Sequence, residues 1–163
     1  MNANNRGSGP QAPNGWKRLL FRLPIYLYRY RLGWVLGNRF LLLNHIGLKS
    51  GKIRQVVLEV TRYDANTHRY TVASGFGTQS QWYRNLRATP NVTIQVGHRR
   101  MNVAAEFLSP DDSGEAMVKY AQAHPKVAQN LMSMLGYHPI NEEDYRQLGQ
   151  ESIPFITFRQ VYR

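Results

Sequence analysis

The chain has 163 residues, 42% of them hydrophobic, and a formal net charge of +11, and this length suffices for one domain with a buried core. It contains no cysteine, which excludes disulfides, thiolate nucleophiles and sites where cysteine holds zinc or an iron–sulfur cluster. Residues 1–110 carry 16 Lys and Arg against three acids, and residues 1–58 carry no acid. This asymmetry predicts an anionic partner: nucleic acid, a membrane surface or a polyanionic cofactor.

The N-terminal part of the chain divides into two segments. Residues 1–15, rich in Asn, Gly, Ser and Pro, predict a disordered tail and lack the apolar stretch of a signal peptide. Residues 16–36 combine apolar and aromatic residues at helical spacing with basic residues, which predicts an amphipathic helical segment interrupted at Pro24. We expect 16–163 to be a single cytoplasmic domain, with residues 16–36 packed on it or in peripheral contact with a membrane.

From residue 40 the pattern becomes that of an antiparallel sheet. Apolar and alternating runs predict strands at 40–44, 56–63, 69–74, 92–96, 101–107 and 153–158. Ser80 is expected to cap a short helix ending near Pro90, and capping signals at Ser109 and Asn141 open C-terminal helical regions, divided further at Pro125. The predicted fold class is α+β: an antiparallel β-barrel of about six strands with N-terminal, inserted and C-terminal helices.

The segment from Gly47 to Arg54 has the composition of an anion-binding turn. Glycines let backbone amides approach a phosphate, Ser50 adds a hydroxyl donor, and Lys49 and Arg54 add charge-assisted hydrogen bonds. The segment lacks the glycine–lysine order of a P-loop. A plain solvated basic turn would have the same composition, so the pattern alone leaves both interpretations open.

Two further segments could face a ligand. The small-residue loop Ala73–Gly77 leads into the Ser80 helix and could present an anion to a helix N-terminus, although an ordinary hairpin exit would look the same. In the helix, Asn85 could serve a heteroaromatic ring. The histidines lack metal-ligand spacing and the acids lack a pairing for hydrolysis, so no metal site is expected. Binding features without acid–base machinery suit hydride transfer by a cofactor.

The order and spacing of motifs between about residues 40 and 108 resemble the deazaflavin-dependent nitroreductase family. The motifs are Leu41-Leu42-Leu43, Gly47-Leu48-Lys49-Ser50-Gly51, Arg54, Val72-Ala73-Ser74-Gly75, Trp82-Tyr83-Arg84-Asn85-Leu86 and Pro90-Asn91-Val92. The resemblance implies a split β-barrel of the flavin-reductase and pyridoxamine-phosphate-oxidase kind. It also implies reduced coenzyme F420, which has a phosphodiester and an oligoglutamate tail, as hydride donor.

The resemblance also implies which residues bind the cofactor. Lys49, Ser50 and Arg54 would hold the anionic tail, and Trp82, Tyr83 and Asn85 would flank the deazaflavin. The full set of expected cofactor-binding residues is Leu48, Lys49, Ser50, Gly51, Arg54, Gln55, Val56, Val57, Leu58, Ala73, Ser74, Gly75, Phe76, Gln81, Trp82, Tyr83 and Asn85. Tyr137 is the expected catalytic residue, by analogy with a C-terminal tyrosine of the family that assists proton delivery.

The function expected from these features is hydride transfer from reduced F420 to a nitro-bearing or conjugated organic acceptor. Ile53 and Val57 stand where family members often have proline, so FMN is kept as the alternative cofactor. A non-catalytic cofactor-binding or nucleic-acid-binding module is the alternative from another class, and in the latter Arg39, Arg87, Arg99 and Arg100 would contribute. A homodimer is expected by analogy with split-barrel proteins.

Overall fold

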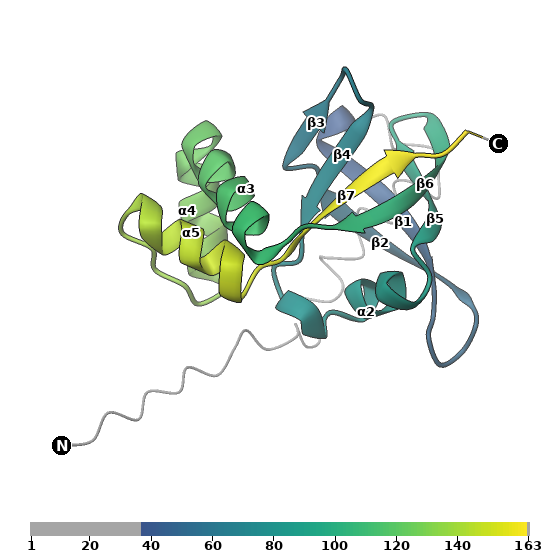
Figure 1. Cartoon of the computed structure of the whole chain (residues 1–163), viewed down its shortest axis with the longest axis horizontal. Coiled ribbons are helices and arrows are strands. Elements are labelled where there is room, and N and C mark those ends of the chain that lie inside the picture. Colours follow the sequence, from purple (N-terminus) through teal and green to yellow (C-terminus); the bar gives the residue numbers. More distant parts are fainter. Residues whose placement is uncertain (1–36, 163) are drawn as a thin grey trace.

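The computed structural model describes residues 37–162 of the chain (Figure 1). The expected tail and the amphipathic segment at 16–36 lie outside these residues. Within them, seven strands form one antiparallel sheet in the order β2-β1-β5-β6-β7-β4-β3. The strands are β1 (Phe40–Ile46), β2 (Ile53–Glu59), β3 (Arg62–Asp64), β4 (Arg69–Ala73), β5 (Asn91–Val96), β6 (Arg99–Phe107) and β7 (Phe155–Gln160).

The sheet is curled because its two edges are connected by only two residues. Strands β2 and β3 occupy opposite edges of the sheet, yet only Val60 and Thr61 separate them in the chain. Thr61 donates its backbone N–H to the carbonyl of Thr71 on β4 at 2.9 Å, and Val60 donates to Arg39 beside β1 at 2.8 Å. The chain therefore passes directly from one edge to the other, which confirms the predicted split-barrel fold.

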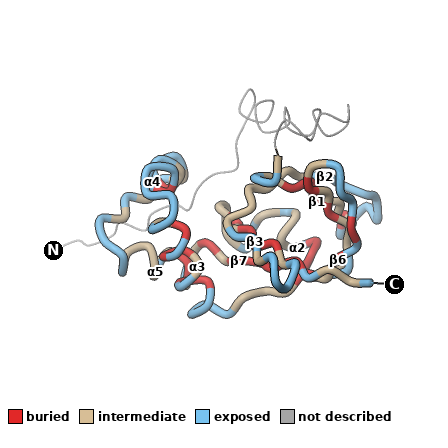
Figure 2. The backbone as a smooth tube through the Cα atoms, turned by 90° about the horizontal axis from the view of Figure 1, so that it is seen from above, coloured by how far each residue is buried: buried red, intermediate tan, exposed pale blue. Residues whose placement is uncertain are grey.

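Alternation along the strands fills the interior of the curled sheet. Leu41 and Leu43 of β1 are fully buried beside Val72 of β4, Ile94 of β5 and Phe158 of β7. Figure 2 shows these buried segments on the strands that surround the interior. Removing such apolar surface from water is the main contribution to the stability of the barrel.

Helices lie at one side of the sheet and across one end of it (Figure 1). The lateral group, whose shared core includes Met117 and Met132, consists of α3 (Pro110–Ala123), α4 (Pro125–Met134) and α5 (Glu142–Glu151). The expected caps form: Ser109 accepts the N–H of Asp112 at 3.1 Å, and Asn141 makes a capping box with Asp144. The inserted helix is α2 (Gln81–Ala88), preceded by the 3₁₀ turn η2 (Gly77–Gln79).

Three local expectations were wrong. The strand expected at 56–63 is interrupted at Val60 and Thr61, where the chain bends between the edges of the sheet, and the last strand begins at Phe155 because Pro154 has no N–H for the ladder. The Ser80 side chain makes no capping bond to α2, since its hydroxyl lies 3.0 Å from that of Ser74.

No helix within residues 37–162 is both long and apolar enough to cross a bilayer.

Candidate functional site

The hairpin between β1 and β2 forms the cationic turn, which we define as residues 47–54. Gly47 donates its N–H to the carbonyl of Lys52, and Gly51, at φ +64°, donates to the carbonyl of Gly47, both at 2.8 Å. A Cβ on Gly47 would lie 2.6 Å from the hydroxyl oxygen of Ser50. Gly51 therefore needs glycine for its backbone conformation, whereas a side chain at Gly47 would have to displace the Ser50 hydroxyl.

The charges of this turn are available to a ligand. Lys49, Lys52 and Arg54 are exposed, and within residues 37–162 none of them forms an ion pair with an acid. The Ser50 hydroxyl accepts the N–H of Lys52 at 3.3 Å, which leaves its own proton free to donate. Three cations and one hydroxyl donor therefore lie on one hairpin, an arrangement that favours an anion.

A buried hydrogen-bonded pair, His45 and Asn85, fixes the turn against α2. Asn85, 7% exposed, accepts the N–H of Leu48 at 3.0 Å and lies 2.8 Å from Nδ1 of His45, which is 5% exposed. Because the Leu48 N–H requires the amide oxygen of Asn85, the amide nitrogen must donate to His45. Nδ1 of His45 is therefore the acceptor, and its proton, when the ring is neutral, sits on Nε2.

The environment of His45 agrees with this protonation state. Burial, and secondarily the positive charge of Arg54, lower the pKa of His45 to about 4. A protonated ring would place a donor against the Asn85 amide group. His45 was not among the residues expected to form the site. The signal was the alternation of β1, which puts His45 on the inward face after Leu41 and Leu43.

The loop after β4 is held by hydrogen bonds of Ser74, one within the loop and one to the residue before β7. The buried Ser74 donates its hydroxyl to the carbonyl of Gly77 at 2.7 Å and its N–H to the carbonyl of Pro154 at 2.9 Å. A Cβ on Gly75 would lie 3.2 Å from Leu135, just after α4. The loop thus approaches the helical group closely, and Phe76 is half-buried within it.

The remaining residues expected to bind the cofactor differ in how much of their side chain is buried against the barrel core. Trp82 and Tyr83 are half-buried against the barrel core, as are Val56 and Leu58. Gln55 is exposed and donates to Asn44 at 2.9 Å, Val57 is half-buried, and Leu48 and Gln81 are exposed. The structure therefore brings the turn and α2 together through Asn85.

Tyr137 and two other tyrosines of the C-terminal part, Tyr120 and Tyr145, are placed differently. Tyr137 is half-buried against the core of the helical group, which Ala73 and Leu135 also contact. It follows Gly136, whose φ of +87° reverses the chain after α4. Tyr145 packs against the same core. Tyr120 is buried and donates to Glu59 at 3.2 Å; burial and the neighbouring carboxylate raise its pKa.

Comparison with known proteins gives the family of the chain. A family model described as F420H(2)-dependent quinone reductase matches residues 28–133. An F420H(2)-dependent quinone reductase of Mycobacterium tuberculosis strain H37Rv is 34% identical over an alignment of 100 residues, which covers 57% of this chain and 66% of that protein. The match thus spans slightly less than two thirds of the relative's length.

Two solved structures share the fold at low sequence identity. An F420-H2 dependent reductase (FDR-A) superposes with a TM-score of 0.52 at 20% identity, covering 76% of this chain and 96% of its own. A pyridoxamine 5'-phosphate oxidase-related, FMN-binding protein of Nostoc punctiforme PCC 73102 gives 0.52 at 15% identity, covering 92% and 82%. At these identities the likeness is evidence of a common fold.

Proposed function

Because the chain belongs to the F420H(2)-dependent quinone reductase family, we propose that it reduces a conjugated organic acceptor with reduced F420. The observation that carries this proposal is the cationic turn. It presents Lys49, Lys52 and Arg54 without acid partners among the described residues, and Asn85 holds it against α2. A cofactor with an anionic tail and an aromatic ring needs these two elements next to each other.

The residues of the turn suit the tail of the cofactor. Lys49 and Arg54 would supply charge to the phosphodiester and the oligoglutamate, and Ser50 would donate its free hydroxyl proton. Exposed cations attract polyanions over several ångströms, an attraction that salt screens. The alternative of a plain solvated basic turn accounts less well for the buried anchor provided by Asn85 and His45.

The ring would lie near α2 and the loop after β4. Trp82 and Tyr83 offer half-buried aromatic surface there, and Ser74 keeps the loop fixed through its bond to Gly77. The amide of Asn85 is used by Leu48 and His45, so we propose that it acts on the cofactor through the position of the turn. When bound, reduced F420 would supply the hydride from C5 of its deazaflavin.

The acceptor would be a quinone or a nitro-bearing compound, both of which take up hydride into a conjugated system. Tyr137 is the proposed proton donor for the reduced acceptor, since it packs on the same helical core as Ala73 of the loop. Protein side chains here position and protonate, while the cofactor supplies the redox chemistry.

Titration of the purified full chain with F420 and, separately, with FMN tests the proposal. We expect saturable binding of F420 at micromolar concentrations, followed by oxidation of reduced F420 when a soluble quinone or a nitroaromatic compound is added. Tight binding of FMN without binding of F420 would replace the proposal with the alternative cofactor. Light scattering of the same sample would test the expected homodimer.

A further inference from the structure

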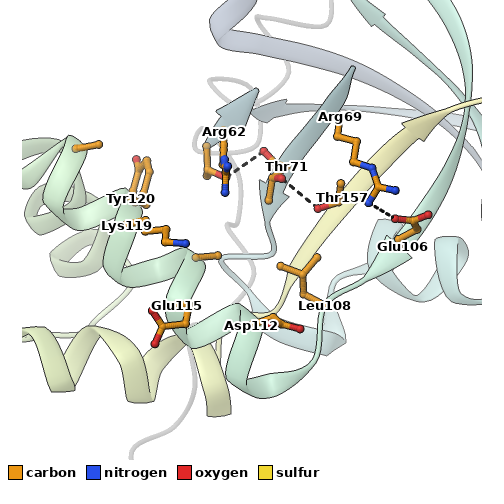
Figure 3. Close-up of a pocket in the computed structure, with 13 residues that line it drawn as sticks. Arg62, Arg69, Thr71, Glu106, Leu108, Asp112, Glu115, Lys119, Tyr120 and Thr157 are labelled. Atoms are coloured by element: carbon orange, nitrogen blue, oxygen red, sulfur yellow. Dashed lines mark hydrogen bonds and ion pairs between the residues drawn. The ribbon is translucent and has the colours of Figure 1, made fainter. Parts of the chain in front are cut away.

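A cavity of about 480 Å³ lies between α3 and the strands β3, β4, β6 and β7 (Figure 3). Thr71, which lines it, stands between Tyr70 and Val72 of the barrel core, so the cavity is on the outer face of the sheet. None of the residues that we assign to F420 lines it. Its volume is within the range of small-molecule sites.

Two threonine hydroxyls make the floor of the cavity polar. Thr71 and Thr157, each 9% exposed, place their hydroxyl oxygens 3.1 Å apart. In such a pair one hydroxyl donates to the other, and the accepting hydroxyl keeps its own proton. The nearby Thr61 hydroxyl donates to the backbone carbonyl of Thr71 at 3.0 Å, and among the described residues no hydrogen bond joins it to the hydroxyl of Thr71 or Thr157. One O–H donor is therefore left for a ligand.

Three cations line the cavity, Arg62, Arg69 and Lys119, and two of them reach it from opposite walls. Arg62 extends from β3 and Lys119 from α3, as Figure 3 shows. Within residues 37–162 neither forms an ion pair with an acid. A flexible ammonium and a planar guanidinium can both bind an oxyanion through charge-assisted hydrogen bonds.

The acids around the cavity have other partners. Glu106 uses one carboxylate oxygen for Arg69 at 2.9 Å and the other for Arg159 at 2.7 Å. Asp112 accepts the Ser109 hydroxyl at 2.8 Å at the start of α3. Glu115 is paired with Arg146 of α5. Glu106 and Glu115 are therefore paired with arginines, and Asp112 keeps its charge. Among the described residues that line the cavity, the two unpaired cations, Arg62 and Lys119, outnumber this one unpaired acid.

We propose that this cavity binds a small organic oxyanion, a carboxylate or a phosphate monoester. The anionic head is held by Lys119, Arg62 and the free hydroxyl of the Thr71–Thr157 pair. Leu108, Ala116 and Ala123 also line the cavity, and they accommodate a short apolar body. The site is independent of the proposed F420 site, since it shares no residue with it.

Nuclear magnetic resonance of the ¹⁵N-labelled full chain tests this proposal, with benzoate, phenyl phosphate and neutral benzyl alcohol as probes. We expect benzoate or phenyl phosphate to shift the amide signals of Thr71, Thr157 and Lys119 saturably below about 10 mM, and benzyl alcohol to leave them unchanged. The more effective of the two anions identifies the preferred head group. The absence of saturable shifts at these amides with both anions would overturn the proposal.

Charge-removing variants separate this cavity from general attraction to a basic protein. Lys119→Gln and Arg62→Gln change exposed side chains, and each should weaken binding by about tenfold or more. Lys126→Gln removes an exposed cation of α4 that does not line the cavity, and it should leave affinity unchanged. Binding that survives both cavity substitutions, or shifts confined to residues 47–54, would overturn the proposal.

Discussion

Asn85 of α2 accepts the backbone N–H of Leu48 at 3.0 Å, which ties the cationic turn to the helix proposed to border the cofactor ring. Asn85→Ala removes this acceptor and the donor to His45. We expect a loss of about 1–3 kcal/mol in the free energy of unfolding for each buried group left unpaired. We also expect about tenfold weaker F420 binding, because the turn loses its anchor.

Urea denaturation and cofactor titration measure the two effects separately. Asn91→Ala, at an exposed residue that begins β5, is the control and should change neither quantity. An Asn85→Ala protein that folds and binds F420 as tightly as the parent would show that the turn does not need this anchor.

His45 makes stability depend on pH in a specific window. Its pKa is about 4 in the folded protein against 6.5 for a free imidazole, so between these values the unfolded chain binds the extra proton. The contribution of His45 to stability is therefore complete above about pH 6.5 and is lost as the pH falls toward 4. The slope approaches roughly 1.4 kcal/mol per pH unit, with a total on the order of 3 kcal/mol.

Replacing the imidazole isolates this contribution from that of the carboxylates. Urea denaturation at several pH values should give a smaller loss of stability on acidification for His45→Gln than for the parent. His98→Gln, at an exposed turn position, should keep the full loss. Equal pH dependence in the parent and the His45→Gln protein would mean that His45 titrates normally in the folded state.

The barrel was predictable because it depends on local alternation. Leu41 and Leu43, or Val92 and Ile94, show which face of each strand is inward without knowledge of the partner strand. The break at Val60 and Thr61 could not be predicted, because it exists only where the chain connects the two edges of the curled sheet. The sequence around these residues is strand-like and gives no indication of the bend.

The site was predictable only where the chain is contiguous. Lys49, Ser50 and Arg54 lie on one hairpin, so their spacing indicates a common role. The pairing of His45 with Asn85 joins residues 40 positions apart, and the Thr71–Thr157 pair joins residues 86 apart. Such pairs depend on packing of β1 against α2 and of β4 against β7, which a single sequence does not specify. The absent Ser80 cap has the same cause, since the Ser80 hydroxyl bonds to Ser74, a residue six positions earlier that the fold brings close.

The double substitution of Lys49 and Arg54 by Gln tests the role of the turn in tail binding. Both side chains are exposed and form no ion pair within the described part of the chain, so the free energy of unfolding should change by less than about 0.5 kcal/mol. The affinity for F420 should fall by about 100-fold or more if each cation makes one charge-assisted hydrogen bond.

Isothermal titration at two ionic strengths measures this effect. The parent should bind more weakly at high salt, and the double variant should lose most of that salt dependence. Arg99→Gln with Arg100→Gln, on the exposed start of β6, removes the same charge elsewhere and should retain most of the affinity. Equal losses in the two double variants would assign the effect to net charge instead of the turn.

Gly149 of α5 permits the closest contact between helices of the lateral group. A Cβ at this position would lie 2.3 Å from the carbonyl oxygen of Ser113 and 2.8 Å from the Cα of Gly114. Both atoms belong to the backbone of α3, so relief requires the two helices to move apart. We expect Gly149→Ala to destabilise the protein by about 1–3 kcal/mol or more through overpacking, although alanine favours the helix itself.

Thermal denaturation followed by circular dichroism measures this loss, and Gln147→Ala, at an exposed position of the same helix, is the control. The control should be close to neutral, since Gln147 is exposed and its side chain hydrogen-bonds within α5, to Glu151 at 3.1 Å, while alanine is the better helix former. Because the Ser113 hydroxyl accepts the N–H of Phe155, the first residue of β7, at 3.1 Å, displacement of α3 should also disturb β7. A Gly149→Ala protein as stable as the parent would show that the helices can separate without cost to the sheet.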